Sequence, residues 1–402
     1  MLFPLRLLFY LLLLVYFVDS QRAPVNNNHN HHPQVRQPQP PYVEDFVIQI
    51  SPEISIGHFL HVYPSLEYRM RGDVRIGSFQ AIYGSFDKRL TRYLSFSSLV
   101  VDVSRDITAK IYDVQSYAPR HLARLSQTSR LNPEGPHDYV YDPSGGAGID
   151  VYLLDTGVER DPLEFDNRVT FGADFTGDGE GDRNGHGTCV AGIVGSKTYG
   201  VAKRTNLIDV KVINDNGKGK LSWVLAGLQF VLNNRGRNSR PSVVNMSLGT
   251  PKNTMLNKAV QQLIAMNIPV VAAAGNSDSS ACRVSPASAD GAFVIGAFDD
   301  RTDSVASFSN WGQCVDAFAP GVNILSVAYN GNTPVLYSGT SVAAPIGAGL
   351  VAYFMGMGDT GPQAVQRARD LRQEGKLSRS TFIFKPLTEN YVLYNEAGEP
   401  LW

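Results

Sequence analysis

The stretch Ile149-Asp-Val-Tyr-Leu-Leu-Asp-Thr-Gly157 decides the fold class of this chain. It is a short, β-rich apolar run that ends at Asp155 and is followed by a Thr-Gly turn. Similar runs recur along the chain between segments with helical spacing. We expect strands at 149–154, 243–248, 269–274 and 292–298, and helices at 221–233, 255–266 and 341–355. Continuous apolar strands between helices predict an α/β fold, a mainly parallel sheet with helices on both faces.

Composition agrees with a globular body of this kind. The chain has 402 residues, which at about 150 residues per domain predicts two or three domains. Hydrophobic residues make up 43% and charged residues 18%, so a sizeable core is available. Lys and Arg number 36 against 37 Asp and Glu. This balance argues against nucleic acid or an anionic membrane surface as the main partner.

Two N-terminal segments lie outside this pattern. Residues 1–20 combine Arg6 with an apolar run, Leu7 to Val18, that is shorter than the roughly 20 residues of a membrane span. We interpret 1–20 as a secretory signal peptide, with an uncleaved anchor as the alternative, and expect no membrane span elsewhere. Residues 21–41 are rich in Asn, His, Gln and Pro and predict a disordered linker. Metal binding by the histidines of that linker is an alternative.

Residues 42–109 predict a separate small α+β module. Strands are expected at 43–50, 78–83 and 98–103, and a helix at 85–94 with Phe86, Leu90, Tyr93 and Leu94 on one face. A module of this size buries a marginal core by itself. We therefore expect it to rely on the body that follows, residues 110–402.

His186 is the only histidine from Ile149 onward. It lies in Asn184-Gly-His-Gly-Thr-Cys-Val-Ala-Gly192, where an apolar stretch predicts a helix that begins at the histidine. A histidine that only supports the structure is the ordinary interpretation. Flanking glycines at a helix start, however, favour a group that is presented to a cleft.

Three more polar residues stand at comparable places. Asp155 ends an apolar strand, Ser341 opens the apolar helix after Gly339, and Asn276 directly follows the strand at 269–274. An isolated serine at a helix start is an ordinary N-cap. In combination with His186 these types suit nucleophilic catalysis: imidazole removes the hydroxyl proton, a carboxylate orients the imidazole, and an amide stabilises an oxyanion.

The chain order Asp155, His186, Ser341 is the order found in subtilisin. Five motifs resemble those of the subtilase family of serine proteases: Asp155-Thr-Gly157, His186-Gly-Thr188, Asn245-Met-Ser-Leu-Gly249, Ala274-Gly-Asn276 and Gly339-Thr-Ser341. Further segments, including Tyr199-Gly-Val-Ala-Lys203 and Phe308-Ser-Asn-Trp-Gly312, are similar to the proteinase K branch and above all to the fungal cerevisin group. The resemblance covers about residues 42–395.

The resemblance implies roles for particular residues. Asp155, His186 and Ser341 would form a catalytic triad, with Asn276 as the oxyanion donor. Residues expected to contact a peptide are Ser247, Leu248, Gly249, Ala274 and Gly275 as walls of the primary pocket, and Gly217, Lys218 and Gly219 as a strand edge. Cys282 and Cys314 would form a disulfide. Asp316, with the main-chain carbonyls of Asp290 and Ala292, resembles a structural calcium site, although catalysis requires no cofactor.

The resemblance also implies an enzyme that matures itself. Residues 42–109 resemble an inhibitory, ferredoxin-like propeptide, cut near Lys110 from the peptidase domain at 110–402. We expect a monomeric serine endopeptidase of broad specificity, acting on polypeptides and located outside the cell or in a vacuole. Cys189 resembles a buried free cysteine of the proteinase K branch, and its use as a nucleophile beside His186 is the alternative.

The nucleophile helix departs from the family pattern at two positions. Val342 stands where methionine is usual, and Ile346 begins the segment that usually reads His-Val-Ala-Gly. A β-branched residue beside Ser341 can shift its rotamer, so the alternative function is a weak or inactive subtilase-like scaffold that keeps its propeptide. Lipase and metalloprotease functions are disfavoured, because the chain has neither a Gly-x-Ser-x-Gly nor a His-Glu-x-x-His motif.

Overall fold

The computed structural model describes residues 43–107, 111–330 and 333–397. The expected signal peptide (1–20), the linker (21–41) with its histidines, and the maturation point near Lys110 lie outside the described residues. The chain divides into two compact units, Met1–Ala109 and Lys110–Trp402.

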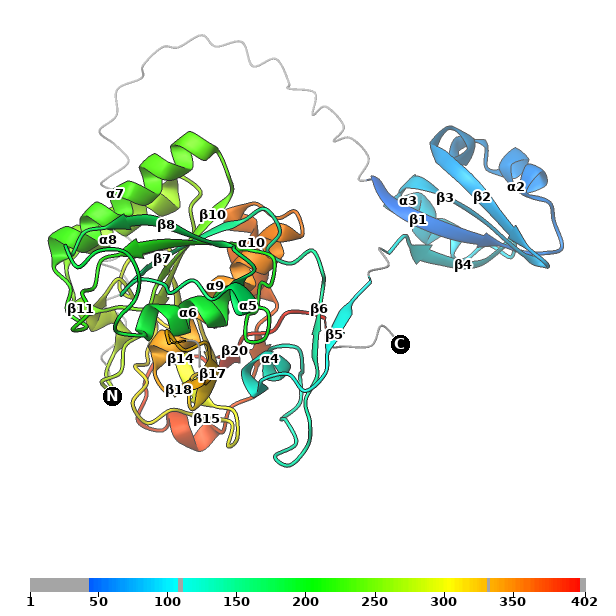
Figure 1. The fold of residues 1–402 in the computed structure, drawn as a ribbon. Coiled ribbons are helices and arrows are strands. Elements are labelled where there is room, and N and C mark those ends of the chain that lie inside the picture. Colours follow the sequence, from blue (N-terminus) through cyan, green and yellow to red (C-terminus); the bar gives the residue numbers. More distant parts are fainter. Residues whose placement is uncertain (1–42, 108–110, 331–332, 398–402) are drawn as a thin grey trace, which may run out of the picture. The chain divides into compact units, whose positions relative to one another are not determined.

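The first unit contains one antiparallel sheet with short helices (Figure 1). Its elements are β1 (Val43–Ile50), α2 (Ile56–Val62), the 3-10 helix η1 (Pro64–Arg69), β2 (Met70–Ile76), β3 (Phe79–Asp87), α3 (Lys88–Leu94) and β4 (Val100–Arg105). The strands lie in the order β2-β3-β1-β4. Along the chain, its strands and α-helices follow one another in the order strand, helix, strand, strand, helix, strand.

The helix expected at 85–94 begins later, at Lys88. Pairing of β3 with β1 continues to Asp87, so Phe86 is buried as a strand residue. The Asp87 carboxylate then accepts hydrogen bonds from the backbone N–H groups of Arg89 and Leu90, which caps α3. Tyr93 is 67% exposed, so it does not lie on the buried face that was expected for this helix.

The second unit is built on a sheet with the strand order β19-β20-β16-β14-β12-β10-β7-β9-β8, with β15 beside β14. The strands are β7 (Asp150–Asp155), β8 (Val169–Asp174), β9 (Asn206–Lys211), β10 (Ser242–Met246), β12 (Val270–Ala273), β14 (Phe293–Asp299), β15 (Ser304–Val305), β16 (Ala317–Pro320), β19 (Gln373–Glu374) and β20 (Tyr391–Val392). Pairing is parallel from β8 to β20 and antiparallel only where β15 and β19 join. The expected α/β class is therefore confirmed.

Helices cover both faces of this sheet (Figure 1). They are α4 (Arg120–Leu125), α5 (Pro162–Phe165), α6 (His186–Gly195), α7 (Leu221–Asn238), α8 (Thr254–Ala265), α9 (Thr340–Gly356) and α10 (Gly361–Asp370). Alternate residues of β7 belong to different cores: Val151 and Leu153 pack with α6 and α9, whereas Tyr152 and Leu154 pack with α7 and α8. A two-residue period along a strand buried on both faces produces this division.

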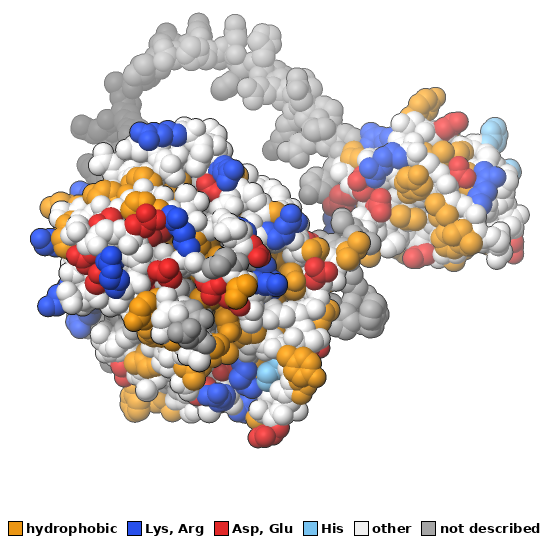
Figure 2. All heavy atoms as spheres, viewed as in Figure 1, with side chains coloured by type: hydrophobic (Ala, Val, Ile, Leu, Met, Phe, Trp, Pro, Cys, Tyr) orange, Lys and Arg blue, Asp and Glu red, His pale blue; other side chains and the backbone are white. Residues whose placement is uncertain are grey.

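Smaller elements complete the second unit. They are β5 (Asp113–Gln115), β6 (Tyr139–Tyr141), β11 (Thr250–Pro251), β13 (Val284–Ser285), β17 (Ile324–Ser326), β18 (Val335–Tyr337) and the 3-10 helices η2 (Ala281–Arg283) and η3 (Arg379–Phe382). Among the described residues, no single helix is long and apolar enough to cross a membrane, and the one bent pair that passes by length and composition is α9 with α10. On the face seen in Figure 2, basic and acidic side chains are interspersed.

Candidate active site

The four candidate catalytic residues lie at ends of elements. Asp155 ends β7, His186 begins α6, Ser341 is the second residue of α9, and Asn276 follows β12. Because β7 and β12 run parallel on either side of β10, their carboxyl ends lie at the same edge of the sheet. That edge is where open α/β sheets form their functional sites.

Asp155 and His186 are in direct contact. The His186 Nδ1 atom lies 2.7 Å from the Asp155 Oδ1 atom, which also accepts the Thr156 N–H at 2.8 Å. Asp155 is 2% exposed, and its Oδ2 atom has no hydrogen-bond partner among the described residues. A buried carboxylate on Nδ1 holds the imidazole in the tautomer whose Nε2 atom is free to accept a proton.

A glycine makes this contact achievable. A Cβ atom on Gly187 would lie 2.1 Å from the Gly157 carbonyl oxygen and 3.2 Å from the Asp155 Cβ atom. A side chain larger than hydrogen would therefore push the start of α6 away from β7. Gly187 therefore lets the start of α6 approach β7 closely. Its sequence context had suggested only that the glycines leave the histidine open to a cleft.

The carboxylate neighbours also set the charge of the imidazole. Burial disfavours the charged form of His186, but the charge and hydrogen bond of Asp155, together with the more distant charge of Asp182, outweigh it. The pKa of His186 is therefore raised above its ordinary value. A raised pKa strengthens the group as a base and stabilises the imidazolium that forms when it takes a proton.

Ser341 and Asn276 face one point in space. A Cβ atom built on Gly339 would lie 3.0 Å from the Ser341 Oγ atom and 3.2 Å from the Asn276 Nδ2 atom. The Asn276 Oδ1 atom accepts hydrogen bonds from the Thr340 N–H and hydroxyl, both at 2.8 Å, so the amide N–H₂ end is turned toward that point. Ser341 lies inside α9, whose N-cap is Gly339, so it is not the N-cap that an isolated serine would suggest.

The histidine and the serine are not hydrogen-bonded to each other in this state. Among the described residues, Asp155 is the only hydrogen-bond partner of the His186 ring. Catalytic hydrogen bonds are often long without substrate and shorten only when substrate binds.

Two hollows adjoin these residues. The first, about 390 Å³, is lined by Asp155, His186, Gly217, Gly219, Ile213, Leu221 and Val224 among others. The second, about 440 Å³, is lined by Ala273, Gly275, Asn276, Val284, Thr340 and Ser341 among others. The segment from Ser247 to Thr250 lines both hollows.

The structure brings together most of the residues expected to contact a peptide. Gly217, Gly219, Ser247, Leu248, Gly249 and Gly275 line the hollows. Two of the expected residues do not line these hollows. Lys218 is exposed and is not part of the lining of the first hollow, and Ala274 is fully buried in the core. Gly219 already pairs with Ile213 in an antiparallel bridge, so part of the expected strand edge is used within the chain.

Comparison with known proteins identifies the family. A family model described as the subtilase family matches residues 146–369. The chain belongs to the subtilase family. It is 38% identical to the subtilase-type proteinase RRT12 of Saccharomyces cerevisiae over 80% of this chain and 74% of that protein. It is 39% identical to cerevisin of the same organism over 69% of this chain and 46% of cerevisin.

A solved structure gives the same result. The crystal structure of a cold adapted subtilisin-like serine proteinase matches this subtilase with a TM-score of 0.64 and 37% identity, covering 69% of this chain and 98% of that one. The predicted resemblance to the subtilases, including cerevisin, is therefore confirmed. This subtilase is a serine endopeptidase, a hydrolase whose substrates are polypeptides.

Several residues that position the site were missed in the sequence. The Asp182 carboxylate is 2% exposed and accepts hydrogen bonds from the Thr156 hydroxyl, the Gly185 N–H and the Thr188 N–H. It thereby joins the end of β7 to the first turn of α6. Its position four residues before His186, in a loop rich in Gly and Asp, carries no distinctive signal.

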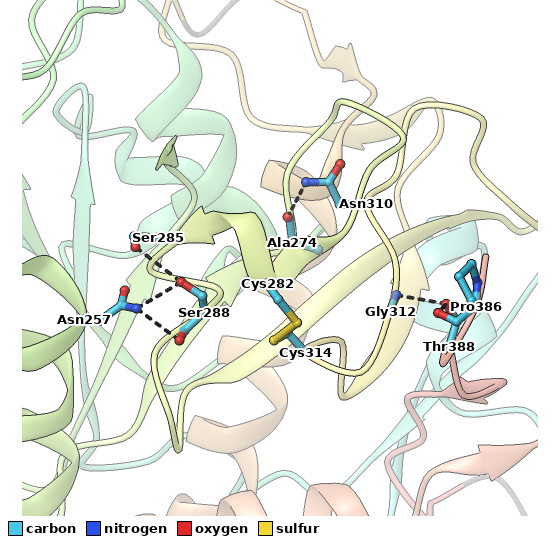
Figure 3. Close-up of a disulfide and its surroundings, with 10 residues drawn as sticks. All are labelled: Asn257, Ala274, Cys282, Ser285, Ser288, Asn310, Gly312, Cys314, Pro386 and Thr388. Atoms are coloured by element: carbon cyan, nitrogen blue, oxygen red, sulfur yellow. Dashed lines mark hydrogen bonds between the residues drawn. A yellow bond between two sulfur atoms is a disulfide. The ribbon is translucent and has the colours of Figure 1, made fainter. Parts of the chain in front are cut away.

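Asn310 has the same role on the other side of the site. Its Nδ2 atom donates to the Ala274 carbonyl at 2.8 Å (Figure 3). Its Oδ1 atom accepts the Ser277 N–H at 3.0 Å. These bonds hold both flanks of Asn276. The motif Phe308-Ser-Asn-Trp-Gly312 pointed to this segment, although it did not reveal what the asparagine contacts.

The residues expected to bind calcium do not fit a calcium ion. The Asp316 Oδ1 atom accepts a hydrogen bond from the Arg369 Nε atom at 2.9 Å, and its Oδ2 atom accepts the Val294 N–H at 2.8 Å. The same guanidinium lies 3.4 Å from the Ala292 carbonyl oxygen. The Asp290 carboxylate accepts a hydrogen bond from Gln261, whereas the ligand expected from this residue is its main-chain carbonyl. A cationic side chain therefore already bridges two of the expected oxygen ligands.

The cysteines behave as the resemblance implied. Cys282 and Cys314 form the expected disulfide, with Cα atoms 5.4 Å apart (Figure 3). Cys189 is free and fully buried, and burial raises the pKa of its thiol to about 12. A buried thiol with a raised pKa carries little nucleophilic thiolate at neutral pH, which argues against the cysteine mechanism.

Proposed function

We propose that this subtilase cleaves peptide bonds with Ser341 as the nucleophile and His186 as the general base. The Ser341 Oγ atom attacks the peptide carbonyl carbon while the His186 Nε2 atom takes its proton. His186 then donates that proton to the leaving amine, and water hydrolyses the acyl-enzyme by the reverse sequence. The 2.7 Å hydrogen bond from His186 to Asp155 carries this proposal, because it prepares the imidazole for both transfers.

We assign Asn276 as the oxyanion donor. The Thr340 hydroxyl and N–H hold its amide oxygen, which leaves Nδ2 to donate to the oxygen that becomes negative. Removal of a donor of this type costs roughly 3 to 4 kcal/mol of transition-state stabilisation.

Substrates are extended polypeptides of varied sequence. The segment from Ser247 to Thr250 runs between two hollows, so a peptide strand beside it can put alternate side chains into different hollows. Main-chain hydrogen bonds supply affinity in such binding and depend little on sequence. The expected specificity is therefore broad.

We further propose that the chain is a secretory-pathway precursor that acts as a monomer once mature. Residues 1–20 would be removed as a signal peptide, and 42–109 would inhibit the peptidase domain at 110–402 until self-cleavage near Lys110. The boundary between the two compact units, at Ala109 and Lys110, supports this division.

The test compares the parent chain with Ser341→Ala after expression through a secretory pathway. The parent should lose everything before about Lys110 and react with a covalent serine-hydrolase probe, whereas the variant should remain an unlabelled precursor by intact mass. Cys189→Ala is the matched control, because that thiol plays no part in the mechanism and both processing and labelling should persist.

An unlabelled parent that keeps its first unit would instead support the scaffold alternative. Val342 and Ile346, the two departures from the family pattern, are 1% and 0% exposed and pack in the core around α9.

A further inference from the structure

We propose that Arg283 adds, within the broad specificity proposed above, a moderate preference for substrates with an acidic side chain immediately before the cleaved bond. This inference rests on the proposed function, since it concerns the hollow beside Ser341. Of the described residues that line that hollow, Arg283 is the only charged one. The others are apolar, glycine, hydroxyl or amide residues, and none of them is a carboxylate that could neutralise the guanidinium.

The guanidinium is available to a substrate. Arg283 is exposed, and no ion pair or side-chain hydrogen bond engages it among the described residues. Other arginines of this unit are committed: Arg120 pairs with Asp300, Arg367 with Asp359 and Arg369 with Asp316.

The backbone that carries Arg283 is held on both sides. Cys282, the preceding residue, is tied to Cys314 by the disulfide (Figure 3). The Arg283 carbonyl accepts the Lys252 N–H at 2.8 Å, and β13, which begins at Val284, pairs with β11. The backbone of Arg283 is therefore held in place in the wall of the hollow.

The position of Val284, the next residue, shows how close this wall of the hollow lies to Gly249 and Gly275. A Cβ atom on Gly249 would lie 3.1 Å from the Val284 Cγ1 atom, and one on Gly275 would lie 3.5 Å from Val284 Cγ2. Val284 thus packs between the two segments that form the sides of the hollow. Gly275 precedes the oxyanion donor Asn276, so a side chain held in this hollow belongs to the residue whose carbonyl is attacked.

Chemistry favours a carboxylate as the partner. Ser277, Ser279 and Thr250 add hydroxyl groups to the lining, and a carboxylate can accept hydrogen bonds from hydroxyls and guanidinium alike. A basic side chain would meet a like charge. Because the arginine is solvated, its contribution should be moderate, a preference of roughly 10-fold for a charged over a neutral side chain.

The experiment measures kcat/KM for two chromogenic peptide anilides that differ only in Glu or Gln before the cleaved bond. This pair has nearly the same shape and isolates the charge. The parent enzyme should favour the Glu peptide about 10-fold, and Arg283→Gln should reduce this ratio to about 1. Arg283→Lys should retain most of the preference.

Arg379→Gln is the matched control, since it removes another exposed arginine that lines neither hollow. It should leave the ratio unchanged. The preference of the parent should also weaken at high salt, because the screening length falls from about 10 Å at 0.1 M to about 3 Å at 1 M.

Equal ratios in the parent and Arg283→Gln, with both enzymes active, would overturn the role of Arg283 and leave the proposed mechanism intact. Failure of the parent to cleave either peptide would overturn the mechanism, and this inference with it.

Discussion

Replacement of Arg369 by Gln tests whether this subtilase carries its own cation at the place where calcium was expected. The substitution removes the 2.9 Å hydrogen bond from the Arg369 Nε atom to Asp316 and the guanidinium beside the Ala292 carbonyl. A hydrogen bond to a charged group contributes about 1.5 to 3 kcal/mol. The two side chains are 27% and 19% exposed, so solvent screening limits the loss to about 2 kcal/mol.

The assay is thermal unfolding in the Ser341→Ala background, which prevents self-digestion. For a unit of this size, a loss of about 2 kcal/mol lowers Tm by roughly 4 °C at a fixed scan rate. The variant also frees the Asp316 and Ala292 oxygen atoms for a metal ion. With a Kd on the order of 1 mM, about 10 mM calcium would restore about 1.4 kcal/mol.

Calcium should raise the Tm of the parent less than it raises the Tm of Arg369→Gln. The difference between these two increases in Tm is the quantity that tests the prediction. Arg379→Gln, in which an exposed arginine without an ion pair is changed, should respond to calcium as the parent does. An equal calcium response in parent and Arg369→Gln would refute the reasoning, since the arginine would then not stand in for the ion.

Four further outcomes are expected at the catalytic residues and at Gly339 beside them. Asn276→Ala should lower kcat by about 10²- to 10³-fold with little change in KM, and steady-state kinetics that show only a KM effect would contradict its role as oxyanion donor. His186 must be neutral to take a proton, and its pKa is raised, so kcat/KM should fall as the pH drops through that raised value. Asp155→Asn should move this acid limb to lower pH besides lowering kcat by about 10⁴-fold, and a pH-rate profile with an unmoved limb would argue against the coupling. Gly339→Ala should lower kcat by about 100-fold while the folded protein persists by circular dichroism, because its Cβ atom would lie 3.0 Å from the Ser341 hydroxyl; unchanged kcat would show that the hollow can adjust.

The sequence predicted the secondary structure correctly where a local pattern is compatible with only one kind of element. The expected strand at 149–154 is observed as β7 (Asp150–Asp155), and the helix expected to begin at His186 is α6. The prediction was wrong where two patterns overlap, as at Phe86, which fits a helix face but pairs in β3. The strand β2 and the helix α10 were missed, because neither contains a long apolar run.

The sequence by itself determined the parallel α/β class, the chain order Asp155, His186, Ser341 and the family that this order indicates. Only the tertiary structure decided how these residues meet: the 2.7 Å contact of His186 with Asp155, the hydrogen bonds by which Asp182 joins Thr156 to Thr188, and the bridge from Arg369 to Asp316. The physical reason is the separation along the chain over which each kind of interaction acts. Periodicity and turn chemistry act between near neighbours, whereas Arg369 and Asp316 are 53 positions apart and meet only after α10 packs beside the sheet.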